Sequence, residues 1–217
     1  MQSIEDIMRE SREGQVVCRA KVMVEPKVAE ATFVRIAEAM LPHFQLEPVR
    51  GAVSSLCGWL YQYNDLSPMR GVLLRGRTGR GKTFLMQVLQ RFMQIDEDLT
   101  RYRVGRRQYA MRMLIATAEQ MTSDFAERSF AGIEDYLRAP VLCIDDIGAE
   151  NRYASNFGNT LNVVSYIVRR REERHLITFG TTNIDRLSTC YDDRTLSRMC
   201  GLFNTITLTH NIDFRRK

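Results

Sequence analysis

The chain has 217 residues, of which 44% are hydrophobic and 26% are charged, and its formal net charge is +5. This length is sufficient for one α/β core with a small appendage, and the composition is ordinary for a soluble protein, with an excess of positive charge that is compatible with nucleic-acid contact. No apolar run reaches the length of a membrane span and the polar N-terminus is unlike a signal peptide, so we expect no membrane association.

The cysteines give an indication of the compartment. They are odd in number, include no C-x-x-C pair and stand at Cys18, Cys57, Cys143, Cys190 and Cys200. This usage favours a reducing cytoplasm and argues against a structural zinc site.

Residues 1–66 contain no chemical motif, and we expect them to form a helical N-terminal segment ahead of a second unit at 67–217. Pro26 is placed to open a helix that ends near Leu41, and a second helix is predicted over 48–63. The apolar faces of these helices have two open interpretations. They bind a partner protein, or they pack on the rest of the chain.

The segment Gly76-Arg77-Thr78-Gly79-Arg80-Gly81-Lys82-Thr83 matches the pattern G-x-x-x-x-G-K-[ST], between a predicted strand at 72–74 and a helical pattern at 84–92. A strand, a glycine-rich turn and a helix N-terminus together form an anion cradle of backbone N–H groups. We expect the inner glycines to let the backbone approach the phosphates, Lys82 to reach the β- and γ-phosphates, and Thr83 to hold Mg²⁺. The predicted ligand is ATP with Mg²⁺.

The connection over 95–112 is polar and rich in arginine. Arginines neutralise phosphates and tyrosines stack on unpaired bases, so this segment is a candidate contact for single-stranded nucleic acid. The alternative is a solvated basic loop. The candidate residues are Arg101, Arg103, Arg106 and Arg107, interleaved with Tyr102 and Tyr109.

Alternating strands and helices follow. Strands are predicted at 113–116, 141–144, 176–181 and 204–208, and helices at 117–128 and 157–174. Thr117 to Gln120 has the spacing of a capping box. With the strand at 72–74, the pattern predicts an α/β fold with a five-stranded parallel sheet flanked by helices on both faces.

Two of the predicted strands end in polar residues, and ligands of parallel sheets bind at the carboxyl ends of strands. Asp145 is expected opposite Thr83, where it can bind Mg²⁺, while Asp146 can orient the attacking water. Asn183 can hydrogen-bond the γ-phosphate or that water. The alternatives are a turn-capping aspartate pair and an Asx turn at the end of a strand.

Two groups of arginines are candidate phosphate contacts. Arg194 and Arg198 are four residues apart and share one face of a helix, which suits phosphate recognition, including an arginine finger that reaches the ATP of a neighbouring subunit. The alternative is a surface helix whose arginines pair with Asp192 or Asp193. The run Arg169-Arg170-Arg171 ends a predicted helix, where cations also complement the helix dipole.

The order of these motifs resembles that of an AAA+ ATPase. The segment 142–150, with its DDIGAE string, is similar to the Walker B segment of DnaC/DnaI-type helicase loaders and of IstB transposition ATPases. Residues 180–183 stand where this family has sensor 1. Residues 193–199 are similar to its box VII, in which the second arginine, here Arg198, is usually taken as the finger. The resemblance covers about residues 70–208.

The resemblance implies an AAA+ core at 67–217 that forms homo-oligomers with ATP and loads or remodels a replicative helicase on single-stranded DNA. In this family a helix placed like 117–128 contacts the DNA. Asp146 stands where many AAA+ proteins have glutamate, so hydrolysis is expected to be slow and dependent on assembly. The chain ends soon after the fifth strand, so no full lid with a sensor 2 arginine is expected.

Three alternatives remain open on the sequence. The first is an IstB-like transposition helper that acts on duplex DNA with a transposase. The second is a P-loop kinase for a small metabolite, which would transfer phosphate rather than release it. The third is a nucleotide-dependent adaptor without useful turnover.

Overall fold

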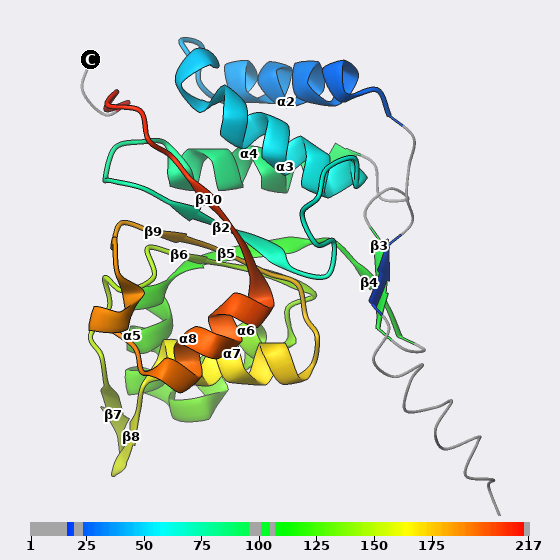
Figure 1. Ribbon diagram of the computed structural model, residues 1–217. Coiled ribbons are helices and arrows are strands. Elements are labelled where there is room, and N and C mark those ends of the chain that lie inside the picture. Colours follow the sequence, from blue (N-terminus) through cyan, green and yellow to red (C-terminus); the bar gives the residue numbers. More distant parts are fainter. Residues whose placement is uncertain (1–16, 20–23, 96–100, 105–106, 215–217) are drawn as a thin grey trace, which may run out of the picture.

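The computed structural model describes residues 17–19, 24–95, 101–104 and 107–214 (Figure 1). At its centre is a parallel sheet in the order β10-β2-β9-β6-β5, which confirms the predicted five-stranded sheet. Its strands are β2 (Gly71–Arg75), β5 (Met113–Thr117), β6 (Val141–Asp145), β9 (Thr178–Thr182) and β10 (Phe203–Thr207). Among the described residues, no helix is both long and apolar enough to cross a bilayer.

Helices cover both faces of the sheet, as predicted (Figure 1). One face carries α2 (Pro26–Met40), α3 (Arg50–Tyr61) and α4 (Lys82–Ile95). The opposite face carries α5 (Ala118–Arg128), α6 (Glu134–Arg138), α7 (Val163–Glu173) and α8 (Asp193–Leu202). Short 3₁₀ helices occur at Glu47–Val49, Ser129–Ile133 and Leu187–Thr189.

The sheet separates two hydrophobic clusters, because successive side chains of a strand point to opposite faces. On β2, Leu74 belongs to the cluster under α2–α4, whereas Leu73 belongs to the cluster under α5–α8. Trp59 of α3 is fully buried, meets the ring of Phe179 edge-on at 4.9 Å, and donates its indole N–H to the carbonyl of Arg70 at 2.6 Å. The apolar faces of α2 and α3 are therefore buried in the same core as the sheet.

The start of α5 shows how the sequence sets a helix boundary. The Thr117 hydroxyl accepts the backbone N–H of Gln120 at 3.0 Å, as the capping prediction requires. The Gln120 side chain donates to Asp124 at 3.0 Å instead of returning to the cap. The helix has the predicted bounds, but only half of the capping box forms.

The arginine-rich connection contains strands that the sequence did not reveal. β3 (Arg101–Val104) pairs antiparallel with β4 (Arg107–Ala110), and β1 (Val17–Arg19) joins β3 to make a separate three-stranded sheet. Tyr102 is 1% exposed, stacks on Tyr109 at 5.1 Å, and donates its hydroxyl to the carbonyl of Pro140. Tyr102 is therefore not available to stack on a base.

The helix predicted over 157–174 begins six residues later, at α7. The residues before it form a hairpin of β7 (Ala154–Asn156) and β8 (Asn159–Leu161), with Phe157 and Gly158 at its turn in left-handed conformations (φ 44° and 85°). Asn162 then caps α7, since its side chain accepts the N–H of Ser165 at 2.9 Å. The predicted start at residue 157 is therefore wrong.

Candidate nucleotide-binding site

The glycine-rich loop follows β2 and ends in the first turn of α4, as predicted. Gly79 and Gly81 both have φ of 83°, a backbone conformation that L side chains rarely adopt. Lys82 is 5% exposed, and its Nζ donates to the carbonyls of Gly76 at 2.7 Å and Arg77 at 3.0 Å. The loop thus curls around the lysine ammonium, within reach of any phosphate that the loop binds.

The first polar group in front of the loop joins three elements. Asp145 lies at the end of β6 and is buried, and the Thr83 hydroxyl of α4 is 3.0 Å from both of its carboxylate oxygens. Thr181 of β9 donates its hydroxyl to the same carboxylate at 2.6 Å. A hydroxyl and a carboxylate that face one another are the oxygen ligands that Mg²⁺ takes beside nucleotide phosphates, so these residues suit the ion.

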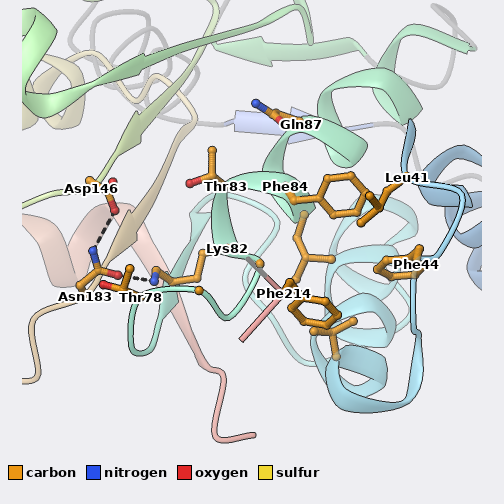
Figure 2. A pocket seen from close by; sticks show the side chains of 14 residues that line it. Leu41, Phe44, Thr78, Lys82, Thr83, Phe84, Gln87, Asp146, Asn183 and Phe214 are labelled. Carbon is orange, nitrogen blue, oxygen red and sulfur yellow. Dashed lines mark hydrogen bonds between the residues drawn. The ribbon is translucent and has the colours of Figure 1, made fainter. Parts of the chain in front are cut away.

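The second polar group contains the other predicted strand-end residues. Asn183 accepts a hydrogen bond from the Lys82 ammonium and donates to Asp146 Oδ1 at 3.1 Å, so it connects the loop to the residue after β6 (Figure 2). The turn after β9 is made by Thr182, whose hydroxyl accepts the N–H of Ile184 at 3.1 Å. The Asn183 side chain is thereby directed into the site.

Asp146 has a strained backbone. Its φ is 55°, a conformation that costs of order 1–3 kcal/mol in a residue other than glycine. Its N–H donates to the Thr181 hydroxyl at 2.9 Å, which holds it in this conformation. With the backbone in this conformation the Asp146 carboxylate accepts the hydrogen bond from Asn183, and such strain is concentrated at functional sites.

The end of the DDIGAE string links the site to α8. Glu150 accepts the N–H of Gly148 at 2.8 Å and also the hydroxyl of Tyr191, two residues before α8. Burial and the nearby Glu150 raise the pKa of Tyr191, so its hydroxyl stays protonated and donates. The sequence alone gave this glutamate no physical role.

A pocket of about 280 Å³ lies in front of the loop, near the lower end of the range for ligand pockets. Figure 2 shows that the polar side chains other than Gln87 lie toward one end of the pocket and the aromatic side chains toward the other. The polar end contains Lys82, Asp146 and Asn183 together with the exposed Thr78. The apolar end is formed by Leu41, Phe44, Phe84 and Phe214, and Val49 also lines the pocket.

Sequence reasoning missed this apolar end. Leu41, Phe44 and Val49 come from the segment between α2 and α3, whereas Phe214 comes from the far end of the chain. No local pattern connects these segments, because they meet only after the sheet has formed. The available signal was limited to the apolar Leu41 and Phe44, which stand at the end of the first predicted helix and between the two.

The remaining loop residues point elsewhere. Arg77 is exposed. The Arg80 guanidinium donates to the carbonyl of Leu208 and lies 3.4 Å from the side-chain oxygen of Asn211. Arg80 therefore contacts the C-terminal segment, so its side chain is not directed at the phosphate position.

The two arginines of α8 have different surroundings. Arg194 is exposed. Arg198 is 29% exposed, and its guanidinium is 2.6 Å from a carboxylate oxygen of Glu172 and 3.9 Å from one of Glu173, both on α7. The alternative was that these arginines pair with Asp192 or Asp193, and Arg198 instead pairs with α7. Asp192 caps α8 through the N–H of Thr195 at 2.8 Å, and the Thr195 hydrogen bonds, with a smaller contribution from Arg194, lower the pKa of its carboxyl.

The other candidates for DNA contact are described only in part. Arg101 and Arg103 are exposed on β3. Arg106 and the side chain of Arg107 lie outside the described residues. The helix that the resemblance relates to DNA contact, α5, buries Met121 and Phe125.

Arg171 differs from the two arginines before it. Arg169 and Arg170 are exposed and lie over the Tyr166 ring, at 5.3 Å and 5.8 Å from its centre. Arg171 is fully buried and donates to the carbonyls of Tyr136 at 2.7 Å and Ala139 at 2.8 Å. Arg171 stands in the last turn of α7, as the dipole interpretation requires, but it is buried and hydrogen-bonded inside the fold, so it is not available as a phosphate contact.

Comparison with known proteins supports the fold. No protein-family description and no curated protein sequence matches the chain. Among solved structures, a putative primosome component from Streptococcus pyogenes matches with a TM-score of 0.58 and 20% identity, over 78% of this chain and 85% of that one. DnaI matches with a TM-score of 0.58 and 22% identity, over 81% of this chain and 94% of its own.

The DnaC helicase loader also matches, with a TM-score of 0.58 and 16% identity, over 77% of this chain and 93% of its own. AMPPCP-bound DnaA from Aquifex aeolicus matches with a TM-score of 0.53 and 16% identity, over 79% of this chain and half of its own. The chain thus shares the fold of these proteins, and that fold contains the five-stranded parallel sheet flanked by helices that the sequence predicted.

Proposed function

We propose that the chain is an AAA+ ATPase that loads or remodels a replicative DNA helicase on single-stranded DNA. The observation that carries the ATPase assignment is the hydrogen-bonded set at the ends of β2, β6 and β9. In this set Thr83 meets Asp145, while Asn183 joins Lys82 to Asp146. A coincidental glycine-rich loop would not be accompanied by an acid and an amide from two neighbouring strand ends.

The proposed roles follow from these contacts. Lys82 exchanges its loop carbonyls for phosphate oxygens, since an ammonium carries three donors and no acceptor. Thr83 and Asp145 would hold Mg²⁺, which would supply positive charge to neutralise the phosphates. Asp146 and Asn183 orient a water for in-line attack on the γ-phosphorus. The bond to the bridging oxygen then breaks to give ADP and inorganic phosphate.

We propose that Arg198 completes this site from a neighbouring subunit. In the single chain it is held by Glu172. Assembly would exchange the Glu172 carboxylate for phosphate oxygens of the adjacent ATP, to which a guanidinium binds at least as well. Hydrolysis would then depend on assembly, and ATP would act as a switch for oligomerisation.

The helicase and single-stranded DNA are proposed as partners on the likeness of fold. One similar structure is described as a helicase loader, another as a primosome component, and a third is DnaA bound to AMPPCP and single-stranded DNA. The exposed Arg101 and Arg103, with Arg106 and Arg107 beside them in sequence, are the proposed DNA contacts.

Nucleotide binding and phosphate release test the ATPase proposal. We expect Lys82→Ala to abolish ATP binding and Asp146→Asn to retain binding but lose hydrolysis. Lys27→Ala, an exposed lysine on α2, is the matched control and should change neither. Undiminished binding by Lys82→Ala would refute the site, and phosphate transfer to a metabolite instead of release would favour the kinase alternative.

A mixing experiment tests the shared site. Arg198→Ala and Lys82→Ala should each be inactive alone, whereas a mixture should recover part of the activity because it places an intact Lys82 beside an intact Arg198. Full activity of Arg198→Ala alone would contradict the trans role.

A comparison of DNA ligands tests the remaining alternative. Tighter binding to duplex than to single-stranded DNA would favour the IstB-like alternative.

A further inference from the structure

The C-terminal segment after β10 (residues 208–214) returns over the glycine-rich loop. Leu208 donates its N–H to the carbonyl of Arg75 at 2.7 Å, and the N–H of Phe214 donates to the carbonyl of Gly79 at 2.9 Å. Arg80 adds the contacts to Leu208 and Asn211 described above. The segment is therefore attached at both of its ends to the loop that is proposed to bind phosphate.

The loop and the segment are closely fitted. A Cβ placed on Gly79 would lie 2.1 Å from a carboxylate oxygen of Asp213, and one on Gly81 would lie 3.3 Å from the Phe214 ring. Both glycines thus make room for the segment as well as adopting a positive φ. This fit fixes where the Phe214 ring stands relative to the loop.

The Phe214 ring forms part of the apolar end of the pocket. It lies across from Phe44 and Phe84 in Figure 2, and the pocket of about 280 Å³ remains open with the ring in place. His210 meets the ring edge-on at 5.6 Å and an interplanar angle of 79°, which limits how the ring can turn. Phe214 is therefore a wall of the pocket and does not plug it.

We propose that Phe214 contacts the base of the bound nucleotide, an inference that rests on the proposed nucleotide site. The polar end of the pocket takes the phosphates, so the base of the same molecule extends toward the apolar end. That end offers aromatic rings and aliphatic side chains, and flat apolar surfaces are what a heterocyclic base contacts. The C-terminal segment thereby contributes binding energy for the nucleoside part of ATP.

The test separates the base from the phosphates. ATP and inorganic tripolyphosphate are compared as ligands by equilibrium binding, the second by competition, because tripolyphosphate has no base. We expect Phe214→Ala to weaken ATP binding by about fivefold to a hundredfold, the range for loss of an aromatic contact with a base. Its affinity for tripolyphosphate should stay within about twofold of the wild type, because tripolyphosphate has no base for Phe214 to contact.

Two further variants serve as a control for the segment and as a fluorescent reporter of the base. Ile212→Ala removes a side chain from the same segment that is 44% exposed, and it should leave both affinities unchanged. Phe214→Trp keeps an aromatic ring and adds a reporter to a chain whose one tryptophan, Trp59, is fully buried. Its fluorescence should change when ATP binds and not when tripolyphosphate binds.

Three outcomes would overturn the proposal. They are unchanged ATP affinity in Phe214→Ala, equal weakening of both ligands, and a Phe214→Trp signal that responds to tripolyphosphate as strongly as to ATP. The second outcome would mean that the segment supports the loop without touching the base. If the wild type bound neither ligand, the nucleotide site itself would be refuted, and this inference with it.

Discussion

Replacement of Arg171 by methionine should destabilise the fold without touching the nucleotide pocket. Besides the carbonyls of Tyr136 and Ala139, the guanidinium donates to the carbonyl of Ile177 and the hydroxyl of Thr178, both at 2.9 Å. These bonds connect α7 to α6 and to the start of β9. The last of these elements carries Thr181 to the site and leads into Asn183.

The expected loss in the free energy of unfolding depends on the backbone carbonyls that would lose the Arg171 guanidinium as their hydrogen-bond donor. Ile177 keeps the N–H of Leu142 as a partner at 3.3 Å, whereas the carbonyls of Tyr136 and Ala139 lose their side-chain donor. A buried polar group without a partner costs about 1–3 kcal/mol, so two of them predict a loss of about 2–6 kcal/mol in the free energy of unfolding. Part of this loss is offset because a costly buried cation is also removed, and that burial lowers the pKa of Arg171 to about 9.

Urea denaturation followed by circular dichroism measures this change, with an unchanged m-value as the condition for comparing free energies. Arg170→Met is the matched control, because Arg170 lies on the exposed face of the same helix, 3.3 Å from Glu173. The control should change the free energy of unfolding by no more than about 0.5 kcal/mol. Equal effects of the two substitutions, or a loss below about 1 kcal/mol for Arg171→Met, would refute the reasoning.

Three further predictions concern Glu172, Gly79 and Cys57. Glu172→Gln removes the charge that holds Arg198, so ATPase activity should reach its half-maximum at a lower protein concentration. An unchanged concentration dependence would argue against the proposal that Arg198 leaves Glu172 for the ATP of a neighbouring subunit. Gly79→Ala places a Cβ 2.1 Å from the C-terminal segment at a φ of 83°, and should weaken ATP binding at least about tenfold in titrations, since about 1.4 kcal/mol corresponds to a factor of ten. Burial raises the pKa of the Cys57 thiol from 9.0 to about 12, so the unfolded chain loses this proton first and stability falls as pH rises above 9. In a urea series between pH 9 and 10 the wild type should lose up to about 1.4 kcal/mol per pH unit more than Cys57→Ala, and parallel slopes would exclude the effect.

The polar half of the site could be predicted from the sequence because each of its residues follows a local signal. The loop has its own glycine pattern, Asp145 and Asp146 follow the apolar run at 141–144, and Asn183 stands two residues after the strand predicted at 176–181. In a parallel sheet the carboxyl ends of the strands meet at one edge, so these three local signals predict that the loop, the two aspartates and the asparagine lie close together in space. The contacts from Thr83 to Asp145 and from Asn183 to Lys82 and Asp146 follow this expectation.

The other half depends on contacts between distant parts of the chain. β1 pairs with β3 across more than eighty residues, and the apolar end of the pocket joins the segment after α2 to Phe214. The β7–β8 hairpin was missed for another reason, since its turn uses Phe157 at a positive φ where a two-residue turn usually has asparagine or glycine. The pairing of Arg198 with Glu172 has no local signal either, because it joins α8 to α7, which lie apart in the sequence.

Capture of a purified replicative helicase by the full chain is the most direct test of the proposed function. With ATP and Mg²⁺ present, the wild type and Lys27→Ala should retain the helicase and deliver it to single-stranded DNA, whereas Lys82→Ala should not. Retention that depends neither on ATP nor on Lys82, or no retention by a wild type that binds ATP normally, would contradict a helicase loader controlled by this site.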